Sequence, residues 1–457
     1  MDFHRLCQGL LLSWSDQKGK TNSTDDLLGW IQSENARTRA ILRRCPLSES
    51  SYWFYDTIES EITNKNQSFF SIKGIKGILS DGRVFEQPII LQNEVGYLGF
   101  IIKEIDGEIQ LLMQAKIEPG NINNVQISPT IQATESNFTQ KHGGRKPCYL
   151  EFFANSSHYL EVYDGEEPEQ CSRFLGKKNR NVAIFVDEDI EVYPHFRWMS
   201  VGQIKFLATH FPNLVNMDTR TVLSCLPFDM GLDEKDNTSL SWFLRGEDET
   251  EYVFSELARY RSFANNQTKL VRLDLLHDWI LDDNGIRCRL DYPFEIQYYD
   301  IEIQGREVTH WSQPLAVARG QAVFGMFVVD CCGKSFFLIR IKEEIGCSEV
   351  AFFGPTVQME PTELASKKLD SIESLFFDNL YNKKGVLVDT VLSEEGGRFY
   401  HEENRNVLLF TSKQDLPNQL PDGYFLANYR TLRQLIAKYH CLNIQLRDLI
   451  SLCGNKL

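Results

Sequence analysis

A charged pair and a long run of neutral polar residues stand out in the segment QAKIEPGNINNVQISPTIQATESN, residues 114–137. Lys116 and Glu118 close an apolar stretch. If that stretch is a strand, positions i and i+2 face the same way, so the ammonium and the carboxylate lie side by side. A surface ion pair of this kind contributes ~0–1 kcal/mol. The alternative is a pair that contacts a ligand, and the sequence leaves both interpretations open.

The residues after this pair are hydrogen-bonding groups without a charge. Apolar and polar residues alternate along residues 125–132, as in a strand with one apolar face and one face of amides and hydroxyls. Sugars are bound by many neutral donors and acceptors at fixed angles, so such a strand suits the floor of a sugar site. The alternative is a polar loop that uses Asn and Ser for its turns.

Two cationic clusters lie nearby, KHGGRK at 141–146 and GKKNRN at 176–181. The fork of an arginine and the point charge of a lysine both suit phosphate oxygens, so either cluster could hold a diphosphate. The alternative is a pair of solvated basic loops. The acidic background of the chain makes the two clusters conspicuous.

The whole chain is a tandem repeat with a period of half its length. At a shift of 226, Lys116 and Glu118 meet Lys342 and Glu344. At a shift of 225, RFLGKKNRNVAIF (173–185) meets RFYHEENRNVLLF (398–410). Further pairs are Thr130 with Thr356, Gln132 with Gln358, Trp53 with Trp279, Asn216 with Asn443 and Arg220 with Arg447. Positions kept in both copies serve either the shared fold or a shared way of binding a ligand.

The repeat predicts the domain organisation. Residues 1–24 form an N-terminal segment, 25–228 the first repeat, 229–253 an acidic linker and 254–457 the second repeat. Expected helices are 27–44, 254–263, 201–209 and 431–439, and a segment that begins at 216 could continue helically. Expected strands are 69–78, 88–92, 97–105, 108–117 and 182–186, with Asp-Gly turns. Strands followed by helices in each unit favour an α+β fold or a mixed sandwich.

Composition excludes several classes of function. The 457 residues carry 48 Lys and Arg against 63 Asp and Glu, a net charge of −15, which argues against a nucleic-acid-binding surface. No apolar segment reaches the ~18 residues of a membrane span, and the N-terminus lacks the features of a secretory signal. The 11 scattered cysteines predict free thiols in a reducing cytoplasm. No metal-binding pattern or GxGxxG loop is present.

Longer motifs resemble a known family. VQISPTIQATESNF, FRWMSVGQIKFL (196–207) and VNMDTRTVLSCLPF (215–228), with GPTVQMEP and GGRFYHEENRN in the second repeat, resemble the signature runs of the NDP-hexose 2,3-dehydratases. The resemblance implies two Nudix-like domains in a homodimer, nucleotide-sugar sites in both halves and no metal or redox cofactor. It also implies a hydro-lyase that acts on a nucleotide-linked 4-keto-6-deoxyhexose, typically the dTDP sugar, and works together with a 3-ketoreductase.

The chemistry implied by this resemblance removes water across C2 and C3. A base takes the C3 proton, donors stabilise the enolate at the C4 oxygen, and an acid assists loss of the C2 hydroxyl. The resemblance makes Glu118 or His142 the proton-transfer group and Lys116, with Gln126, Thr130 or Gln132, the donors to C4. Candidate hydroxyl contacts are Ser128, Thr134, Ser136 and Asn137. Candidate diphosphate contacts are Arg145, Lys177 and Arg180. Trp53 or Trp198 could stack on the base, and Arg197, Asn216, Asp218 and Arg220 match family motifs with either a binding or a structural role.

The second repeat replaces polar residues with apolar bulk, because Phe352 and Gly354 stand where the first has Gln126 and Ser128. We therefore expect the first repeat to catalyse and the second to be an auxiliary nucleotide-sugar site, with candidate residues Lys342, Glu344, Thr356, Gln358, Arg398 and Arg405. One alternative is a nucleotide-sugar binding protein without catalysis. A Nudix-type pyrophosphatase is disfavoured, because EEIGC (343–347) lacks the rest of the Nudix box.

Overall fold

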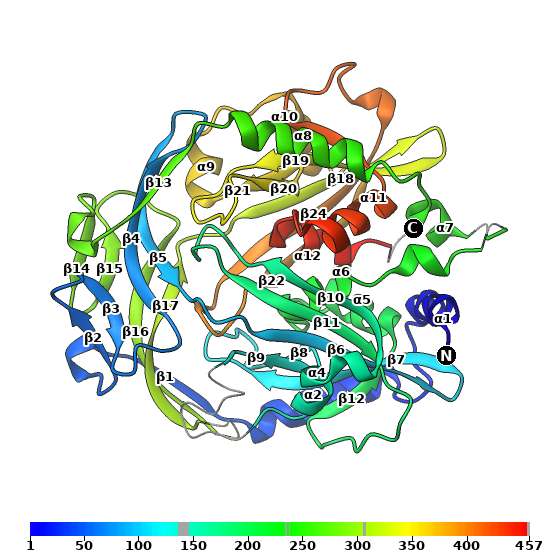
Figure 1. Cartoon of the computed structure of the whole chain (residues 1–457), viewed down its shortest axis with the longest axis horizontal. Coiled ribbons are helices and arrows are strands. Elements are labelled where there is room, and N and C mark those ends of the chain that lie inside the picture. The colour runs from blue at the N-terminus through cyan, green and yellow to red at the C-terminus, as the bar shows by residue number, and fades with distance from the viewer. Residues whose placement is uncertain (136–145, 234, 237, 305–307, 455–457) are drawn as a thin grey trace.

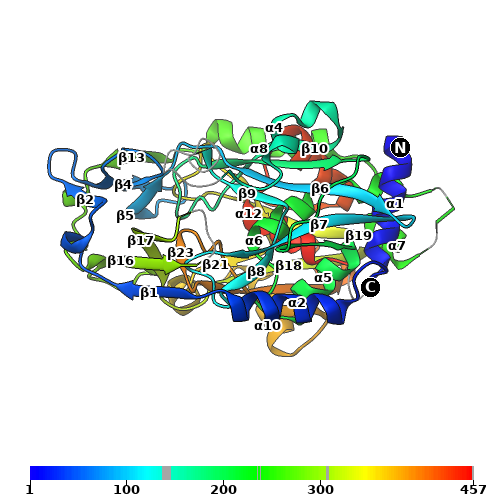
Figure 2. The same cartoon turned by 90° about the horizontal axis from the view of Figure 1, so that it is seen from below.

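The structure is a computed structural model that describes residues 1–135, 146–233, 235–236, 238–304 and 308–454. Each repeat contains a large mixed sheet and a smaller sheet. Figure 1 shows the two large sheets on one side of the molecule and the two small sheets on the other. Figure 2, turned by 90°, shows the chain elongated between these two ends, with the N-terminus at the end of the large sheets.

The large sheet of the first repeat runs in the order β10-β11-β6-β7-β12, with β8 added to β7 and β9 to β6. Strands β11 and β6 are parallel and the other pairs are antiparallel. The strands are β6 (Tyr97–Ile105), β7 (Glu108–Ile117), β8 (Val125–Ser128), β9 (Ile131–Ala133), β10 (Leu160–Pro168), β11 (Lys178–Phe185) and β12 (Phe196–Met199).

The large sheet of the second repeat repeats this plan in the order β20-β19-β18-β24-β22, with β21 on β18 and β25 on β19. Its one parallel pair, β18 with β24, corresponds to β6 with β11. The strands are β18 (Val323–Cys331), β19 (Lys334–Lys342), β20 (Phe352–Pro355), β21 (Val357–Met359), β22 (Val386–Ser393), β24 (Glu403–Ser412) and β25 (Tyr424–Ala427).

The small sheets exchange a strand between the repeats. Strand β1 (Ala40–Arg44) of the first repeat pairs with β16 (Phe294–Ile303) of the second, and β13 (Gln267–Val271) of the second pairs with β4 (Ser71–Ile78) of the first. Both exchanged strands are visible in Figure 1. The remaining small-sheet strands are β2 (Trp53–Asp56), β3 (Glu61–Asn64), β5 (Val84–Leu91), β14 (Trp279–Asp282), β15 (Gly285–Cys288), β17 (His310–Ala318) and β23 (Phe399–Tyr400).

Helices α6 (Met217–Ser224) and α12 (Ile444–Leu452) pack against each other between the two large sheets. Each begins at an asparagine cap, Asn216 or Asn443, whose side chain accepts a backbone N–H. The other α-helices are α1 (Phe3–Ser15), α2 (Thr24–Arg37), α4 (Leu150–Ala154), α5 (Val201–His210), α7 (Ser239–Leu244), α8 (Thr250–Phe263), α9 (Pro361–Ser366), α10 (Ser371–Tyr381) and α11 (Tyr429–Gln434). No helix in the described ranges is long and apolar enough to cross a membrane.

Several expected elements are confirmed, because β6 and β7 span the predicted residues and α5 differs by one. The helix expected over 27–44 is wrong at its end: α2 stops at Arg37, and residues 40–44 form β1. Local pattern could not show this, since β1 is held by backbone hydrogen bonds to the other repeat. The expected linker 229–253 includes α7, whose Phe243 is fully buried against Trp14 and Tyr429.

Candidate active site between the repeats

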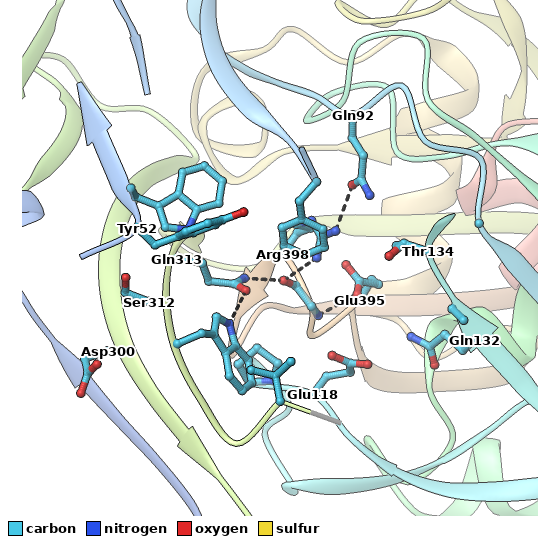
Figure 3. Close-up of a pocket in the computed structure, with 18 of the residues that line it drawn as sticks. Tyr52, Gln92, Glu118, Gln132, Thr134, Asp300, Ser312, Gln313, Glu395 and Arg398 are labelled. Carbon is cyan, nitrogen blue, oxygen red and sulfur yellow. Dashed lines mark hydrogen bonds between the residues drawn. The ribbon is translucent and has the colours of Figure 1, made fainter. Parts of the chain in front are cut away.

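A cavity of about 670 Å³ lies between the large sheet of the first repeat and the small sheets. This volume is within the ~300–1,000 Å³ usual for small-molecule sites. In Figure 3, Gln132 and Thr134 lie at one end of the cavity, Tyr52, Ser312 and Asp300 lie at the other, and Arg398 and Glu395 lie between them. The first repeat supplies one wall, and the second repeat supplies Asp300, Val308, residues 310–313, Glu395, Gly397 and Arg398.

The predicted charged pair lies at the large-sheet end. Lys116 Nζ and Glu118 Oε1 are 3.4 Å apart, and both side chains are mostly buried. Both line the cavity, so the ligand-facing interpretation agrees with their position better than the surface ion pair. Lys116 also donates to the backbone carbonyl of Gln132, which ties β7 to β9 beside the cavity.

Gln132 is held in place by two neutral side chains. One belongs to the same polar run, and the other is the cap of helix α6. Ser128 Oγ donates to Gln132 Oε1 at 2.6 Å, and Asn216 Nδ2 donates to the same oxygen at 3.0 Å. Asn216 is at the same time the cap of α6. Ser128 and Asn216 do not line the cavity; they position the amide of Gln132, which does.

Four carboxyl groups of the cavity lie close enough to interact electrostatically: Glu118, Glu169, Asp218 and Glu395. Burial raises the pKa of Glu395 to about 7, and repulsion by Glu118 and Glu169 acts in the same direction against the attraction of Arg398. Burial, and then repulsion by Glu395 and Glu169, raise the pKa of Asp218 well above its usual range. The site therefore contains carboxyl groups that hold a proton near neutral pH, next to a carboxylate paired with a lysine.

Two cations, Arg398 and Lys177, line the cavity. Arg398 lies over the ring of Phe69 at 4.0 Å, and it donates to Gln92 Oε1 at 3.1 Å. Burial lowers the pKa of Lys177 to about 8. Lys177 donates to Asn179 Oδ1 at 2.7 Å. Arg398 was predicted for a second-repeat site, and it lines this cavity together with residues of the first repeat.

The small-sheet end is aromatic and polar. Tyr52, Trp53 and Trp311 line it. Trp53 is 3% exposed and packs on Phe70 at 4.6 Å between ring centroids, so it serves mainly as core. Tyr52 and Trp311 were not predicted as site residues. Cationic and acidic groups at this end come from both repeats and are Arg43, Arg44, Glu49, Asp300 and His310.

Three predicted residues of the polar and helical motifs form internal supports and do not line the cavity. Thr130 donates to the carbonyl of Leu112 and accepts from the N–H of Ile101, which locks β9 to the sheet. Gln126 donates to the carbonyl of Asn213 and to Ser393 Oγ, both at 2.8 Å. Arg220 is fully buried between the repeats.

Three further candidates lie elsewhere. Arg180 forms an ion pair with Asp164 across β10 and β11. Arg197 donates to the backbone carbonyls of Pro194 and Phe196, and Trp198, also on β12, is buried in the core. None of the three lines the cavity. The predicted residues Ser136, Asn137, His142 and Arg145 lie outside the described residues.

The corresponding residues of the second repeat are engaged with one another. Gln358 Nε2 donates to Glu344 Oε1 at 3.0 Å, and Lys342 donates to the carbonyl of Gln358 at 3.4 Å. Thr356 repeats the backbone contacts of Thr130, and Arg405 repeats the surface pair of Arg180 with Asp389 as its partner.

Arg173, the counterpart of Arg398, faces two glutamates. It is 3.4 Å from Glu360 and 3.8 Å from Glu402, which stand where the first cavity has Thr134 and Lys177. A guanidinium neutralised in this way is a poor partner for phosphate.

Sequence reasoning missed Glu395, Glu169 and Gln92. The alignment at a shift of 225 already paired Arg398 with Arg173, but no sequence signal indicates that residues 395–398 cross into the other repeat. That crossing is fixed by backbone contacts, since Gly120 N–H donates to the carbonyl of Gly396 at 2.7 Å and His401 N–H to that of Gly120 at 2.9 Å. A Cβ on Gly120 would lie 1.6 Å from the carbonyl oxygen of Phe399, so this approach requires glycine.

Together these features define a duplicated α+β protein with a cavity lined by residues of both repeats. Residues 24–226 and 250–453 each match the family model described as NDP-hexose 2,3-dehydratase. The chain belongs to this family, and the family name describes a hydro-lyase reaction on a sugar nucleotide.

Similar proteins carry a more specific name. A dTDP-4-dehydro-6-deoxy-alpha-D-glucopyranose 2,3-dehydratase of Streptomyces violaceoruber is 36% identical over 89% of this chain and 90% of its own. Proteins of the same name from Saccharopolyspora spinosa and Amycolatopsis orientalis are 33% and 29% identical, over 92% and 98% of this chain and 89% and 94% of their own. A solved ADP compounds hydrolase is 15% identical over 36% of this chain and 85% of its own, with a TM-score of 0.22.

Proposed function

We propose that this chain is a dTDP-4-keto-6-deoxyglucose 2,3-dehydratase, which removes water across C2 and C3 to give a 3,4-diketo-2,6-dideoxy sugar. Family membership over both repeats and the shared name of three relatives support this over binding without catalysis. The single structural observation that carries it is the cavity end where an ion-paired carboxylate, Glu118, faces carboxyl groups with raised pKa values.

Glu118 is the base in this proposal. It takes the C3 proton, which is acidic because the carbanion is conjugated with the C4 ketone as an enolate. Lys116 and the amide of Gln132 lie beside Glu118 and serve as donors to the C4 oxygen, where the negative charge develops. Asn216 and Ser128 act through Gln132 as positioning residues.

Glu395 is the acid in this proposal. A carboxyl group with a pKa near 7 is still substantially protonated at neutral pH and can protonate the C2 hydroxyl as it leaves as water. Two carboxyl groups whose environments separate their protonation states are the arrangement that acid–base eliminations require. Loss of water leaves an enol at C2–C3, which tautomerises to the 3-ketone.

The substrate lies with its hexose at the large-sheet end and its base among Tyr52 and Trp311. This orientation puts the diphosphate near Arg398, which lies between the two ends, and near Lys177, whose charge interacts with that of Arg398. Tyr52 and Trp311 both line the cavity, and aromatic side chains suit stacking on a nucleobase.

The direct test incubates the purified protein with dTDP-4-keto-6-deoxyglucose, a 3-ketoreductase and NADPH. We expect a 2-deoxy sugar nucleotide, which mass spectrometry detects. We also expect consumption of NADPH, which is measured by its absorbance. A protein that binds the nucleotide sugar but yields no 2-deoxy product would be a binding protein and not a dehydratase.

The pKa of Glu395 gives a pH prediction. The acid must be protonated, so turnover should fall as the pH rises through about 7. Glu395→Gln keeps the side-chain shape without a titrating proton, and we expect it to lose this descending limb and ~100-fold or more of kcat. Stopped-flow rates from pH 5.5 to 9 compare the two proteins. An unchanged descending limb in Glu395→Gln would assign it to another group, such as Asp218.

The finer structural and cellular assignments are also proposals. Each repeat is Nudix-like, the protein is a cytoplasmic homodimer, and a 3-ketoreductase uses its product. For the second repeat, an auxiliary nucleotide-sugar site stays a prediction, and the pairing of Arg173 with Glu360 and Glu402 weighs against phosphate binding there.

A further inference from the structure

Two thiols and a carboxylate from opposite halves of the chain meet at a contact between the repeats. The Sγ atoms of Cys171 and Cys347 and a carboxylate oxygen of Glu344 all lie within 4.8 Å of one another. Cys171 and Glu344 are buried, and Cys347 is partly exposed, so the group has a route to solvent. We propose that these three side chains form a binding site for a soft divalent cation, with Zn²⁺ as the best match.

The backbone holds the two cysteine segments against each other. Gly346 N–H donates to the carbonyl of Cys171 at 2.9 Å, and Gly176 N–H donates to the carbonyl of Gly346 at 2.7 Å. A Cβ on Gly346 would lie 2.1 Å from the carbonyl oxygen of Phe174. The close approach of the two main chains therefore sets the distance between the two thiols.

The repeat shows what is special about this contact. At the corresponding contact beside the first cavity, Gly396 and Asn121 occupy the places of Cys171 and Cys347. Glu118, the counterpart of Glu344, faces the substrate cavity there. The same backbone arrangement thus brings two thiols together at this contact, whereas the corresponding contact beside the first cavity has no thiol.

The residue types and the partners of Glu344 fit zinc. Thiolates and a carboxylate are ligands of Zn²⁺, with Zn–S bonds of about 2.3 Å, which places two thiolates about 3.8 Å apart in a tetrahedron. Gln358 and Asn443 donate to the two oxygens of Glu344 at 3.0 and 3.2 Å, as outer partners of a metal-bound carboxylate do. Water at the exposed side of Cys347 supplies the fourth ligand.

Binding of the metal releases two protons, one from each thiol. The carboxylate of Glu344 coordinates in its ionised form and releases none. The complex of Zn²⁺ with three anionic ligands carries one negative charge, which the nearby ammonium of Lys342 offsets. Cys171 belongs to the segment that also brings Glu169, Phe174 and Lys177 to the cavity. The metal therefore fastens that segment of the first repeat to the β19–β20 connection of the second.

The test uses metal binding and does not depend on catalysis. Reduced, chelator-treated full-length protein is titrated with Zn²⁺ and, separately, with Co²⁺. We expect about one equivalent of Zn²⁺ bound and a thiolate-to-Co²⁺ charge-transfer band in the near ultraviolet. Cys347→Ser should abolish the band, and Glu344→Gln should weaken Zn²⁺ binding by more than the ~10–100-fold typical of losing an outer partner.

Cys332→Ser, which changes an exposed thiol on the β18–β19 turn, is the matched control and should bind as the unchanged protein does. Cys347 is chosen over Cys171 because its partly exposed side chain makes misfolding of the variant less of a concern, and circular dichroism verifies the fold. Zn²⁺ binding that is equal in Cys347→Ser and the unchanged protein, or a Co²⁺ complex without a thiolate band, would overturn the proposal.

Discussion

Glu118→Gln is expected to lower kcat by at least ~100-fold, because the amide cannot accept the C3 proton. The change keeps the size of the side chain beside Lys116, so binding of the nucleotide sugar should change much less than turnover. Single-turnover rates and nucleotide-sugar affinity are measured on the same preparation. Exchange of the C3 hydrogen with deuterated solvent follows proton removal directly and should be slowed equally.

Glu104 lies on β6 and does not line the cavity. Glu104→Gln is therefore the matched control and should keep the wild-type rate. His142→Asn is the competing variant, because His142 was the other candidate base in the sequence. A Glu118→Gln enzyme with near wild-type turnover, together with an inactive His142→Asn enzyme, would move the base to His142.

Arg220→Met is expected to destabilise the protein by ~3–5 kcal/mol, since it removes the ion-pair partner of the buried carboxyl group of Asp448. Arg220 donates to Asp448 Oδ2 at 3.2 Å and to the carbonyls of Val215 and Ser393 at 2.9 and 3.0 Å. These contacts join α6 to α12 and to β22, so their loss should loosen the repeats from each other. Urea denaturation and thermal melts measure the change.

The double variant Arg220→Met with Asp448→Leu removes both charges and should recover much of the lost stability. This result separates a structural arginine from a substrate contact, which was the other role left open for this motif. An Arg220→Met protein of wild-type stability that no longer binds the nucleotide sugar would restore the binding role.

The amino-acid sequence by itself determined the parts of this protein that depend on local pattern. The repeat, strands β6 and β7, and the side-by-side placement of Lys116 and Glu118 follow from alternation along one strand and from matching positions 226 residues apart. The family follows from long motifs in the expected order. For the polar run, the sequence indicated that apolar and polar residues alternate. It did not indicate that Gln132 lines the cavity while Ser128 holds the Gln132 amide in place.

Only the tertiary structure decided which repeat each segment serves. Residues 40–44 pair with β16 of the second repeat, and residues 395–398 bring Glu395 and Arg398 to the cavity of the first. Because the two repeats are copies, each offers nearly the same strand edge and the same loop, and no local pattern distinguishes the near copy from the far one. The choice depends on how the two large sheets pack across α6 and α12, which is a property of the folded chain as a whole.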